Sequence, residues 1–297
     1  MTTLTTGRGR PGVLWAAPAA IFFAIFGLGP IGAVVYLSFT EWNLLGSPEW
    51  TGLDNWARLF EDPDVVGSVR VTLVLTVLCW LVQTPVSLLL GVWAAGPQRN
   101  RAVLSTIFFV PLLLSTAAIA LTWLSLLDPN FGMAVDLGRF LGVEDGNFLG
   151  DRQLALYTVA FVVTWQFIPF HALIYQAAAQ QIPATLYEAA RVDGADRWRR
   201  FFSVTLPQLR HTVTASSILI VIGSLTYFES ILLLTGGGPG TATRVLPLHM
   251  YVKGFVGTDM GYASVLAVVM VAVGAALSFA IARVTGYHRM SSQREGL

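Results

Sequence analysis

Long apolar segments separated by short polar ones dominate the pattern along this chain. Six of these segments reach the roughly 20 residues that a helix needs to cross the core of a bilayer. The pattern predicts an all-α polytopic membrane protein with one transmembrane helix per segment, at residues 13–39, 69–95, 103–127, 154–179, 213–235 and 262–284. Prolines inside these segments predict kinks, because proline has no N–H for the helix ladder; they are Pro30, Pro85, Pro111 and Pro169.

The longest soluble-looking stretch, residues 183–207, lies between the fourth and fifth predicted spans and is called the elbow below. Thr185 and Glu188 have the spacing of a capping box, which opens a helix. Gly194 adopts a left-handed backbone readily and predicts the end of that helix, and Asp196 is placed to cap a second one. The elbow is therefore predicted as a flat helix-turn-helix, whose second helix carries a stripe formed by Trp198, Phe201, Phe202 and Thr205.

The composition supports a membrane protein. Of the 297 residues, 55% are hydrophobic and only 12% are charged, whereas charged residues make up about a quarter of an average soluble domain. The formal net charge is +1, so no bulk attraction to nucleic acid is indicated. The single cysteine, Cys79, cannot form an internal disulfide and is expected to fill space in an apolar run.

The distribution of basic residues predicts the orientation in the membrane. If the N terminus lies in the cytoplasm, 12 of the 18 basic residues fall in cytoplasmic segments. Because arginine and lysine favour the cytoplasmic side in short loops, both termini are expected there, as tails of residues 1–12 and 285–297. The same count places the elbow in the cytoplasm.

No motif for catalysis or cofactor binding stands out. A Walker A motif needs a lysine followed by serine or threonine, but the only lysine, Lys253, is followed by glycine. The sequence has no His-Glu-x-x-His motif and no cysteine cluster, and no pair of carboxylates lies within a span. We therefore expect a chain that is not an enzyme and binds no cofactor or metal, so that any ATP hydrolysis driving its function occurs on another polypeptide.

A glycine-rich run, Gly236-Gly237-Gly238-Pro239, follows the fifth predicted span. Glycine lets two backbones approach closely, and such runs also cradle phosphate where a helix and a lysine follow. Neither is expected here, because residues 241–248 have the pattern of a loop or short strand. The sequence therefore favours a structural or docking loop over a nucleotide site.

The elbow also carries a characteristic series of residues: Glu188-Ala189-Ala190, then Asp193-Gly194-Ala195, then Leu206-Pro207. This series resembles the cytoplasmic signature loop of permease subunits in binding-protein-dependent ABC importers. The similarity is strongest to the first, F/A-like permease of carbohydrate importers of the maltose and glycerol-phosphate type. Two further segments resemble the same family, Gly52-Leu53-Asp54-Asn55-Trp56, which is usually a short helix there, and Thr235 to Pro239.

The resemblance implies a set of partners in a bacterial plasma membrane: a second, non-identical permease, two ATPase subunits that bind ATP and magnesium, and an extracytoplasmic solute-binding protein that delivers a sugar. The elbow would then be a coupling helix against an ATPase subunit. Glu188 would make a polar contact, Gly194 would give the bend, and Trp198, Phe201 and Phe202 would fill the ATPase cleft or pack beneath it. The glycine-rich run would face the binding protein.

Glu229 lies inside a predicted span, about 9 Å from its outer end if the helix is regular. A charge inside a membrane costs several kcal/mol, so such residues face a cavity or a partner. One hypothesis is that Glu229 lines the translocation path and accepts hydrogen bonds from sugar hydroxyls, with Tyr227 or Phe228 against the sugar ring. Ser224, and more weakly Gln166 in the fourth span, are further candidates. The alternative is that Glu229 is protonated or reaches the outer surface as a structural contact.

Two other classes of function stay open from the sequence. A secondary carrier or channel for a small polar solute would be expected to show internal repeats and more intramembrane charge than one glutamate. An integral membrane enzyme would need a catalytic constellation, which the sequence does not offer. Within the predicted spans, arginine occurs only at the ends, as Arg70 and Arg283, and the absence of arginine deeper in the membrane argues mildly against a phosphorylated substrate.

Overall fold

The computed structural model describes residues 15–96, 106–143 and 145–284. Its contacts divide the chain into two compact units, the first formed by residues 1–61 with 250–269 and the second by residues 62–249 with 270–297. Most described residues are helical, as the apolar pattern predicts. The predicted tails, residues 1–12 and 285–297, lie outside the described residues.

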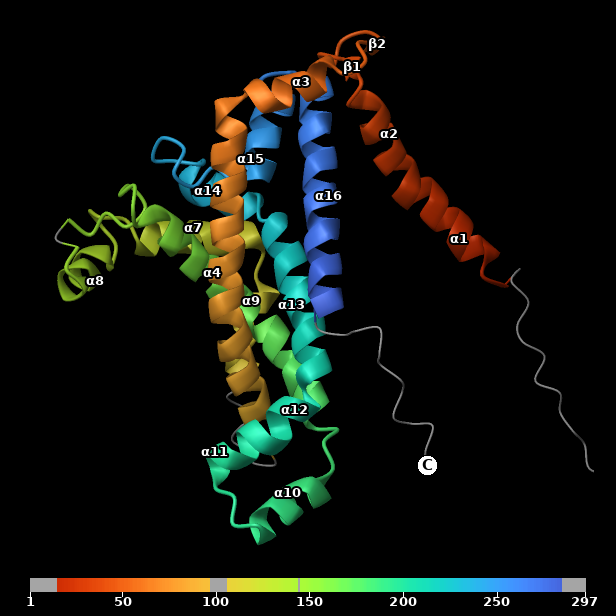
Figure 1. Ribbon diagram of the computed structural model, residues 1–297. Helices are drawn as coiled ribbons and strands as arrows, with labels where there is room; N and C mark the ends of the chain where they lie inside the picture. The colour runs from red at the N-terminus through yellow and green to blue at the C-terminus, as the bar shows by residue number, and fades with distance from the viewer. Residues whose placement is uncertain (1–14, 97–105, 144, 285–297) are drawn as a thin grey trace, which may run out of the picture. The chain divides into compact units, whose positions relative to one another are not determined.

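The first unit begins with the segment predicted as the first span. Helix α1 (Ala17–Phe23), the π-helical turn η2 (Ala24–Leu28) and α2 (Gly29–Leu37) follow one another directly (Figure 1). Pro30 explains the wide turn, because its missing N–H interrupts the regular ladder and a π-helical turn accommodates the interruption. None of these residues is buried, which suits an apolar helix that faces lipid.

A minimal hairpin follows, in which β1 (Thr40–Glu41) pairs antiparallel with β2 (Glu49–Trp50). It is the one departure from an all-α fold among the described residues. The short helix α3 (Asp54–Glu61) comes next, as the resemblance implied for this stretch. The π-helical turn η4 (Val252–Val256) and the beginning of α16 (Met260–Val284) belong to the same unit.

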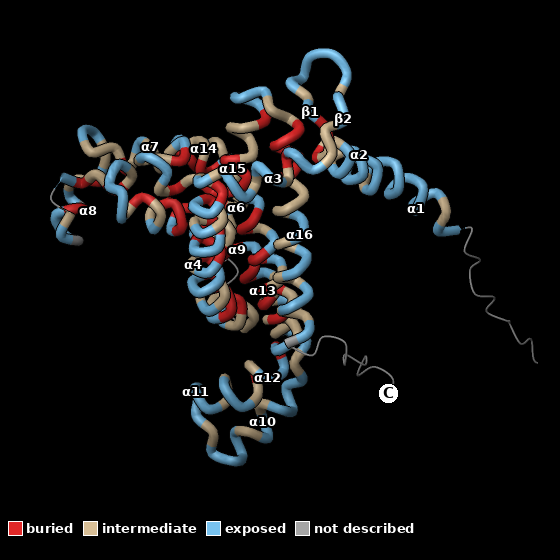
Figure 2. Tube along the Cα trace, turned by 45° about the horizontal axis from the view of Figure 1, so that its top comes forward, coloured by how far each residue is buried: buried red, intermediate tan, exposed pale blue. Residues whose placement is uncertain are grey.

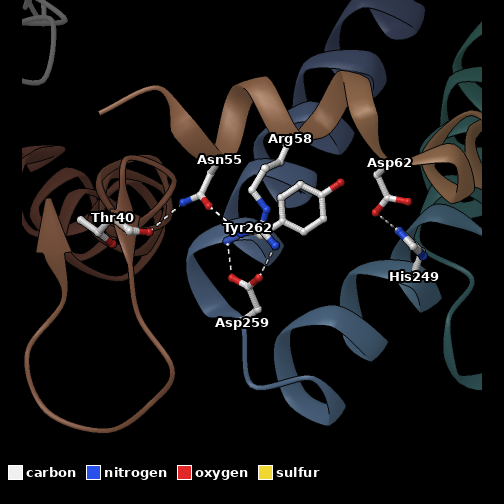
Figure 3. Close-up of polar contacts among 7 residues, drawn as sticks. All are labelled: Thr40, Asn55, Arg58, Asp62, His249, Asp259 and Tyr262. Carbon is white, nitrogen blue, oxygen red and sulfur yellow. Dashed lines mark hydrogen bonds and ion pairs between the residues drawn. The ribbon is translucent and has the colours of Figure 1, made fainter. Parts of the chain in front are cut away.

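Polar contacts connect α3 to the hairpin and to the start of α16 (Figure 3). The buried Asn55 amide donates to the Thr40 carbonyl oxygen over 2.8 Å. The Arg58 guanidinium pairs with the Asp259 carboxylate at 2.7 Å and lies 4.7 Å from the centre of the Tyr262 ring. The first unit is therefore held by side chains that come from widely separated parts of the sequence.

Three helices form the core of the second unit. Helix α4 (Pro63–Ala94) packs against α9 (Ala155–Ala179) and α13 (Arg210–Leu225), and Figure 2 shows buried residues where these helices face one another. A Cβ atom at Gly91 would lie 2.5 Å from the Ala172 carbonyl oxygen. Glycine at this position therefore allows α4 and α9 to approach closely.

The remaining elements of the second unit are short helices, apart from the C-terminal part of α16. Figure 1 shows α7 and α14 at the same end of α13, and these two helices contact each other. Three of these short helices precede the elbow: α6 (Val110–Leu113), α7 (Thr116–Leu126) and α8 (Ala134–Leu141). Two follow it: α14 (Glu229–Thr235) and α15 (Leu246–Tyr251).

Four helices are long and apolar enough to cross a membrane, at Ala17–Leu37, Pro63–Ala94, Ala155–Ala179 and Met260–Arg283. They coincide with the first, second, fourth and sixth predicted spans, although α4 begins six residues earlier than the predicted residue 69. By length and composition, the described residues therefore contain four candidate spans, or five if the bent pair α13 and α14 is one span.

The expectation of one continuous helix is wrong for the third predicted span, residues 103–127. Its first part falls on residues 97–105, which lie outside the described residues. In the rest, α6 ends at Leu114, whose backbone is extended, and α7 starts anew because the Ser115 hydroxyl oxygen accepts from the Ala118 N–H over 3.2 Å. A serine cap thus divides this apolar run.

The fifth predicted span, residues 213–235, is also not one helix. Helix α13 ends at Leu225, α14 begins at Glu229, and the two are bent by 49°. The Thr226 hydroxyl donates to the Gly223 carbonyl oxygen over 2.8 Å, which ends the ladder there. The break places Glu229 in the first turn of a new helix rather than inside a regular one.

Side chains at the start of α4 connect it to α15. The Asp62 carboxylate caps α4 by accepting from the Asp64 N–H over 3.0 Å, and its other oxygen lies 3.3 Å from the Nε2 atom of the buried His249 (Figure 3). Almost three turns further along α4, the Thr72 hydroxyl accepts from the Leu246 N–H over 2.8 Å. Residues 246–248, predicted as loop or strand, therefore open a helix whose position on α4 is fixed.

Candidate functional site

The elbow is a helix-turn-helix, as predicted, at one end of α9 and α13 (Figure 1). Its first helix is α10 (Ala184–Val192), and the second part runs through three short elements: α11 (Arg197–Arg200), the π-helical turn η3 (Phe201–Thr205) and α12 (Leu206–Gln208). Pro207 follows the π-helical turn η3, just as Pro30 follows η2. Proline has no N–H to donate, which interrupts the regular helix ladder.

The start of α10 differs from the prediction. The capping box between Thr185 and Glu188 is wrong, because the N-cap is Pro183 and no side chain caps the helix. The fixed φ of proline suits the residue that leads into a helix. Helix α10 therefore begins at Ala184, and Thr185 lies inside the helix rather than at its N-cap. Glu188 is instead exposed within the helix, without an ion pair among the described residues.

The turn at Gly194 has the predicted geometry. Gly194 has a φ of +74°. The Ala195 N–H donates to the Ala190 carbonyl oxygen over 2.9 Å and the Gly194 N–H to that of Arg191 over 3.0 Å, which is the pattern of a Schellman motif. Asp196 then caps the next helix by accepting from the Arg199 N–H over 2.7 Å. The angle between the two arms of the elbow is thus fixed by backbone hydrogen bonds.

The aromatic residues of the elbow point in two directions. Phe201 packs on the core formed by Leu88, Tyr175 and Leu209, where the second unit is buried. Trp198 and Phe202 are 67% and 60% exposed. The Phe202 ring contacts the Phe201 ring edge to face, with centroids 5.2 Å apart. The elbow therefore has one aromatic side chain packed on the helix bundle and two that are mostly exposed.

Of the predicted path residues, Tyr227 and Gln166 lie in neighbouring positions. The Tyr227 ring stacks on Phe167, the residue after Gln166, with centroids 5.4 Å apart. The Gln166 side chain is buried, and its amide nitrogen donates to the Thr116 hydroxyl over 3.4 Å, while its oxygen has no partner among the described residues. The helix break thus brings α7, α9 and the end of α13 together around polar groups.

Ser224 and Glu229 occupy different surroundings from this group. The Ser224 hydroxyl donates to the Ile220 carbonyl oxygen within its own helix, so it is already used by the backbone. Glu229 is exposed, and no hydrogen bond or ion pair of its carboxylate occurs among the described residues. Phe228, between the break and Glu229, is half-buried.

One polar residue of this region was not predicted from the sequence. Gln83 of α4 is fully buried, and both atoms of its amide are without a hydrogen-bond partner of good geometry among the described residues, although the Tyr227 hydroxyl is a neighbour. A buried amide without partners costs free energy. The sequence signal that could have identified Gln83 is a lone glutamine within an apolar run.

The glycine-rich run forms a closed turn after α14. Gly236 ends α14 with a φ of +58°, and Gly237 has a φ of +91°. The buried Thr243 hydroxyl lies 2.7 Å from the Thr235 hydroxyl and donates to the Gly238 carbonyl oxygen over 2.8 Å. The loop that also contains Pro239 is therefore held from both sides, and its glycines allow backbone conformations that other residues adopt rarely.

The described residues contain no group of three or more histidine, cysteine, aspartate or glutamate side chains that could hold a metal ion. Together with the long apolar helices, the elbow defines a class of protein: a multi-pass membrane protein whose helix bundle carries an exposed helix-turn-helix at one end. Comparison with known proteins specifies this class. Residues 87–286 match the family described as the binding-protein-dependent transport system inner membrane component.

The chain belongs to this family. Over 89% of its length it is 34% identical to the probable ABC transporter permease protein YurN of Bacillus subtilis, of which it covers 92%. It is 31% identical to the diacetylchitobiose uptake system permease protein NgcF of Streptomyces coelicolor, with 94% of this chain and 83% of NgcF covered.

A solved structure is similar in fold. A chain of the bacterial alginate ABC transporter, crystallised in complex with an alginate pentasaccharide-bound periplasmic protein, superposes with a TM-score of 0.79. The two chains are 24% identical, and the match covers 92% of this chain and 93% of the other. The matched family segment contains the whole elbow, the helix break and the glycine-rich loop.

Proposed function

We propose that this chain is the permease subunit of an ATP-driven carbohydrate importer, in which the elbow receives the force produced by a separate ATPase. The observation that carries the proposal is the elbow itself. Its turn is fixed at Gly194, Phe201 attaches it to the bundle, and Trp198 and Phe202 remain exposed. Exposed aromatic residues on a rigid support are typical anchors of protein interfaces.

The carbohydrate class rests on the similar proteins. NgcF is a diacetylchitobiose uptake permease, and the solved structure belongs to a transporter of an acidic polysaccharide crystallised with a sugar-bound periplasmic protein. By analogy we propose that this chain pairs with a second permease, two ATPase subunits and an extracytoplasmic solute-binding protein. ATP and magnesium would bind to the ATPase subunits.

The arrangement in the membrane follows from the same proposal. We assign six spans to the chain, with the bent pair α13 and α14 as one span and α6 and α7 as parts of another. Both termini and the elbow lie on the cytoplasmic side, in agreement with the excess of arginine there. The glycine-rich loop, Gly236 to Pro239, then lies at the opposite end of the fifth span and faces the binding protein.

The mechanism is alternating access. Closure of the ATPase subunits on nucleotide moves the elbow, and the elbow moves α9 and α13, because Phe201 packs on the core between them and α4. A nucleotide can shift this equilibrium only by binding the two states with different affinity, so the elbow must make different contacts with the ATPase in each state. Glu188, Asp193 and the backbone near Ala189 offer polar contacts on the exposed side.

The substrate path is proposed along the helix break. Gln166 of α9 and the newly recognised Gln83 of α4 offer buried amides, and Tyr227 in the helix break offers a hydroxyl; sugar hydroxyls bind such groups. Phe228 and Tyr227 offer rings for stacking against a sugar. The exposed carboxylate of Glu229 lies on the side of the break that leads to the glycine-rich loop, where it could meet a sugar first.

The coupling role is tested by co-purification. In cells that express the whole transporter, a tag on this chain is expected to recover an ATPase subunit. Trp198→Glu combined with Phe202→Glu places two charges on the proposed interface and is expected to abolish the recovery and the uptake of sugar. The matched control is Phe131→Glu, because Phe131 is 93% exposed but belongs to the segment between α7 and α8 and not to the elbow. Equal recovery from the elbow variant and the control would overturn the proposal.

A further inference from the structure

A cavity of about 340 Å³ lies between the elbow and the ends of α4 and α9. Part of its lining is apolar and comes from Val92, Ala179 and Phe201. The other part is polar and cationic, and comes from Tyr187, Arg197 and Arg200. The cavity is therefore amphipathic, with hydrocarbon from the helix bundle and positive charge from the second helix of the elbow.

The two arginines are not neutralised by the protein. Among the residues that the structure describes, no carboxylate lies at ion-pair distance from Arg197 or Arg200. Arg200 donates its Nε–H to the Asp196 carbonyl oxygen over 3.3 Å, which uses one of its five donors. Because residues three apart lie on the same face of a helix, the two guanidinium groups can act on one ligand.

We propose that this cavity binds the phosphate group of an anionic phospholipid from the membrane leaflet on the side of the elbow. Helices α4 and α9 are long and apolar enough to span the bilayer, and the proposal places the ends that line the cavity near one bilayer boundary. Guanidinium groups bind phosphate oxygens through paired, charge-assisted hydrogen bonds. Basic pockets between the ends of transmembrane helices are suited to anionic headgroups, and the apolar part of the lining fits the beginning of the acyl chains.

The site has a consequence for transport. Phe201, which packs on the bundle core, also lines the cavity, and so does Tyr187 of the first elbow helix. A lipid bound there contacts the two arms of the elbow and the ends of α4 and α9 together, and it stabilises their present arrangement. The inference rests on the proposed function only where it concerns coupling; lipid binding itself requires only that α4 and α9 span the membrane.

The test compares lipid retention by full-length variants. The chain, with the subunits that co-purify, is reconstituted with equal parts of phosphatidylglycerol and phosphatidylcholine, and retained lipids are counted by native mass spectrometry after detergent extraction. Arg197→Ala with Arg200→Ala is expected to weaken phosphatidylglycerol retention about tenfold or more. The matched control is Arg199→Ala, which removes a charge from the same helix but does not line the cavity; retention is expected to stay within about twofold.

A second variant separates the cavity from general surface charge. Val92→Trp keeps both arginines but fills the apolar part of the cavity, and it is expected to reduce retention similarly. The melting temperature of each variant in detergent identifies any that fail to fold. Equal loss in Arg199→Ala and the double variant, unchanged retention in both cavity variants, or displacement of the lipid by an equal concentration of inorganic phosphate would overturn the lipid site. Recovery of the ATPase from the same samples tests the proposed function separately.

Discussion

The Tyr187 hydroxyl lies 3.0 Å from the Thr205 hydroxyl, which joins the first helix of the elbow to the π-helical turn of the second part. Thr205 is buried, whereas the residues around Tyr187 on α10 are mostly exposed. This hydrogen bond is a direct side-chain connection between the two arms. It complements the backbone hydrogen bonds at Gly194, which fix the turn itself.

Removing this hydroxyl should weaken coupling without disrupting the fold. Tyr187→Phe keeps the ring and removes one hydrogen bond, which contributes about 1 kcal/mol net. We expect ATP-dependent uptake to fall several-fold while the melting temperature of the purified protein changes little. Tyr157→Phe is the control, because Tyr157 is 59% exposed in α9 and its hydroxyl has no hydrogen bond among the described residues. Normal uptake by Tyr187→Phe would show that the arms do not need this contact.

The turn at Gly194 offers a prediction about backbone conformation. No atom lies within 4 Å of a Cβ built on Gly194, so its replacement meets no steric obstacle and the cost comes from the positive φ of +74°. This cost is about 1–2 kcal/mol for an ordinary side chain and smaller for asparagine. Gly194→Val is therefore expected to reduce recovery of the ATPase in a pull-down more than Gly194→Asn. The reverse order would contradict a left-handed turn.

Two glycines of α4 give a matched pair for the packing of the bundle. A Cβ at Gly91 would meet the Ala172 carbonyl oxygen and the Tyr175 Cβ, whereas a Cβ at Gly67 would meet nothing within 4 Å. Gly91→Ala is expected to lower the free energy of unfolding by about 1–3 kcal/mol, as overpacking does. Gly67→Ala should leave it unchanged or raise it slightly, because alanine favours helix. Thermal unfolding in detergent measures both, and equal shifts would refute the close approach of α4 and α9.

The N-terminus of α4 gives a further prediction. Asp62→Ala removes both the helix cap and the partner of the buried His249 Nε2 atom. Loss of a cap costs about 1 kcal/mol, and loss of a hydrogen bond to a charged group costs about 1.5–3 kcal/mol. We expect Asp62→Ala to lower the melting temperature clearly and Asp62→Asn to restore most of it, since an amide oxygen can still cap. If the two variants melt alike, the capping contact has no energetic role.

The parts of the fold that can be predicted are those in which residues close in sequence determine where a helix begins, ends or turns. The predicted span at residues 154–179 agrees with α9 within one residue, because its apolar side chains continue without a capping residue. Gly194 was predictable for a similar reason, since glycine is the residue that a left-handed turn requires. The break between Leu225 and Glu229 was not, because residues 226–228 include no proline or glycine, and a threonine hydroxyl bonded to its own helix, as in Thr226, also occurs in helices that continue.

In the candidate site, too, some features follow from the local sequence and others only from tertiary packing. The motif of the elbow was visible in the sequence, but the direction of each aromatic side chain was not. Phe201 and Phe202 are adjacent, and only the packing of Phe201 on the bundle leaves Phe202 exposed. Gln83 was missed because one amide within 32 residues of α4 has no periodic signature; its meaning comes from the helices that bury it.

The last prediction concerns the proposed path. Glu229→Gln keeps the size of the side chain and one acceptor oxygen, but it removes the negative charge. Hydrogen bonds to charged groups contribute about 1.5–3 kcal/mol, so loss of such a bond to a sugar hydroxyl should reduce uptake about tenfold or more at low substrate concentration. ATP hydrolysis stimulated by the binding protein should change less, because the elbow is intact.

Glu41→Gln is the matched control, since Glu41 is also exposed but lies in the hairpin of the first unit. Gln83→Leu extends the test to the buried end of the path: it keeps the volume and removes both unpaired amide atoms. It should therefore stabilise the purified protein while it reduces uptake, because the amide is costly to bury but available to a substrate. Unchanged uptake in both Glu229→Gln and Gln83→Leu would place the sugar path elsewhere in the bundle, whereas a loss confined to one of them would locate the end at which the sugar is bound.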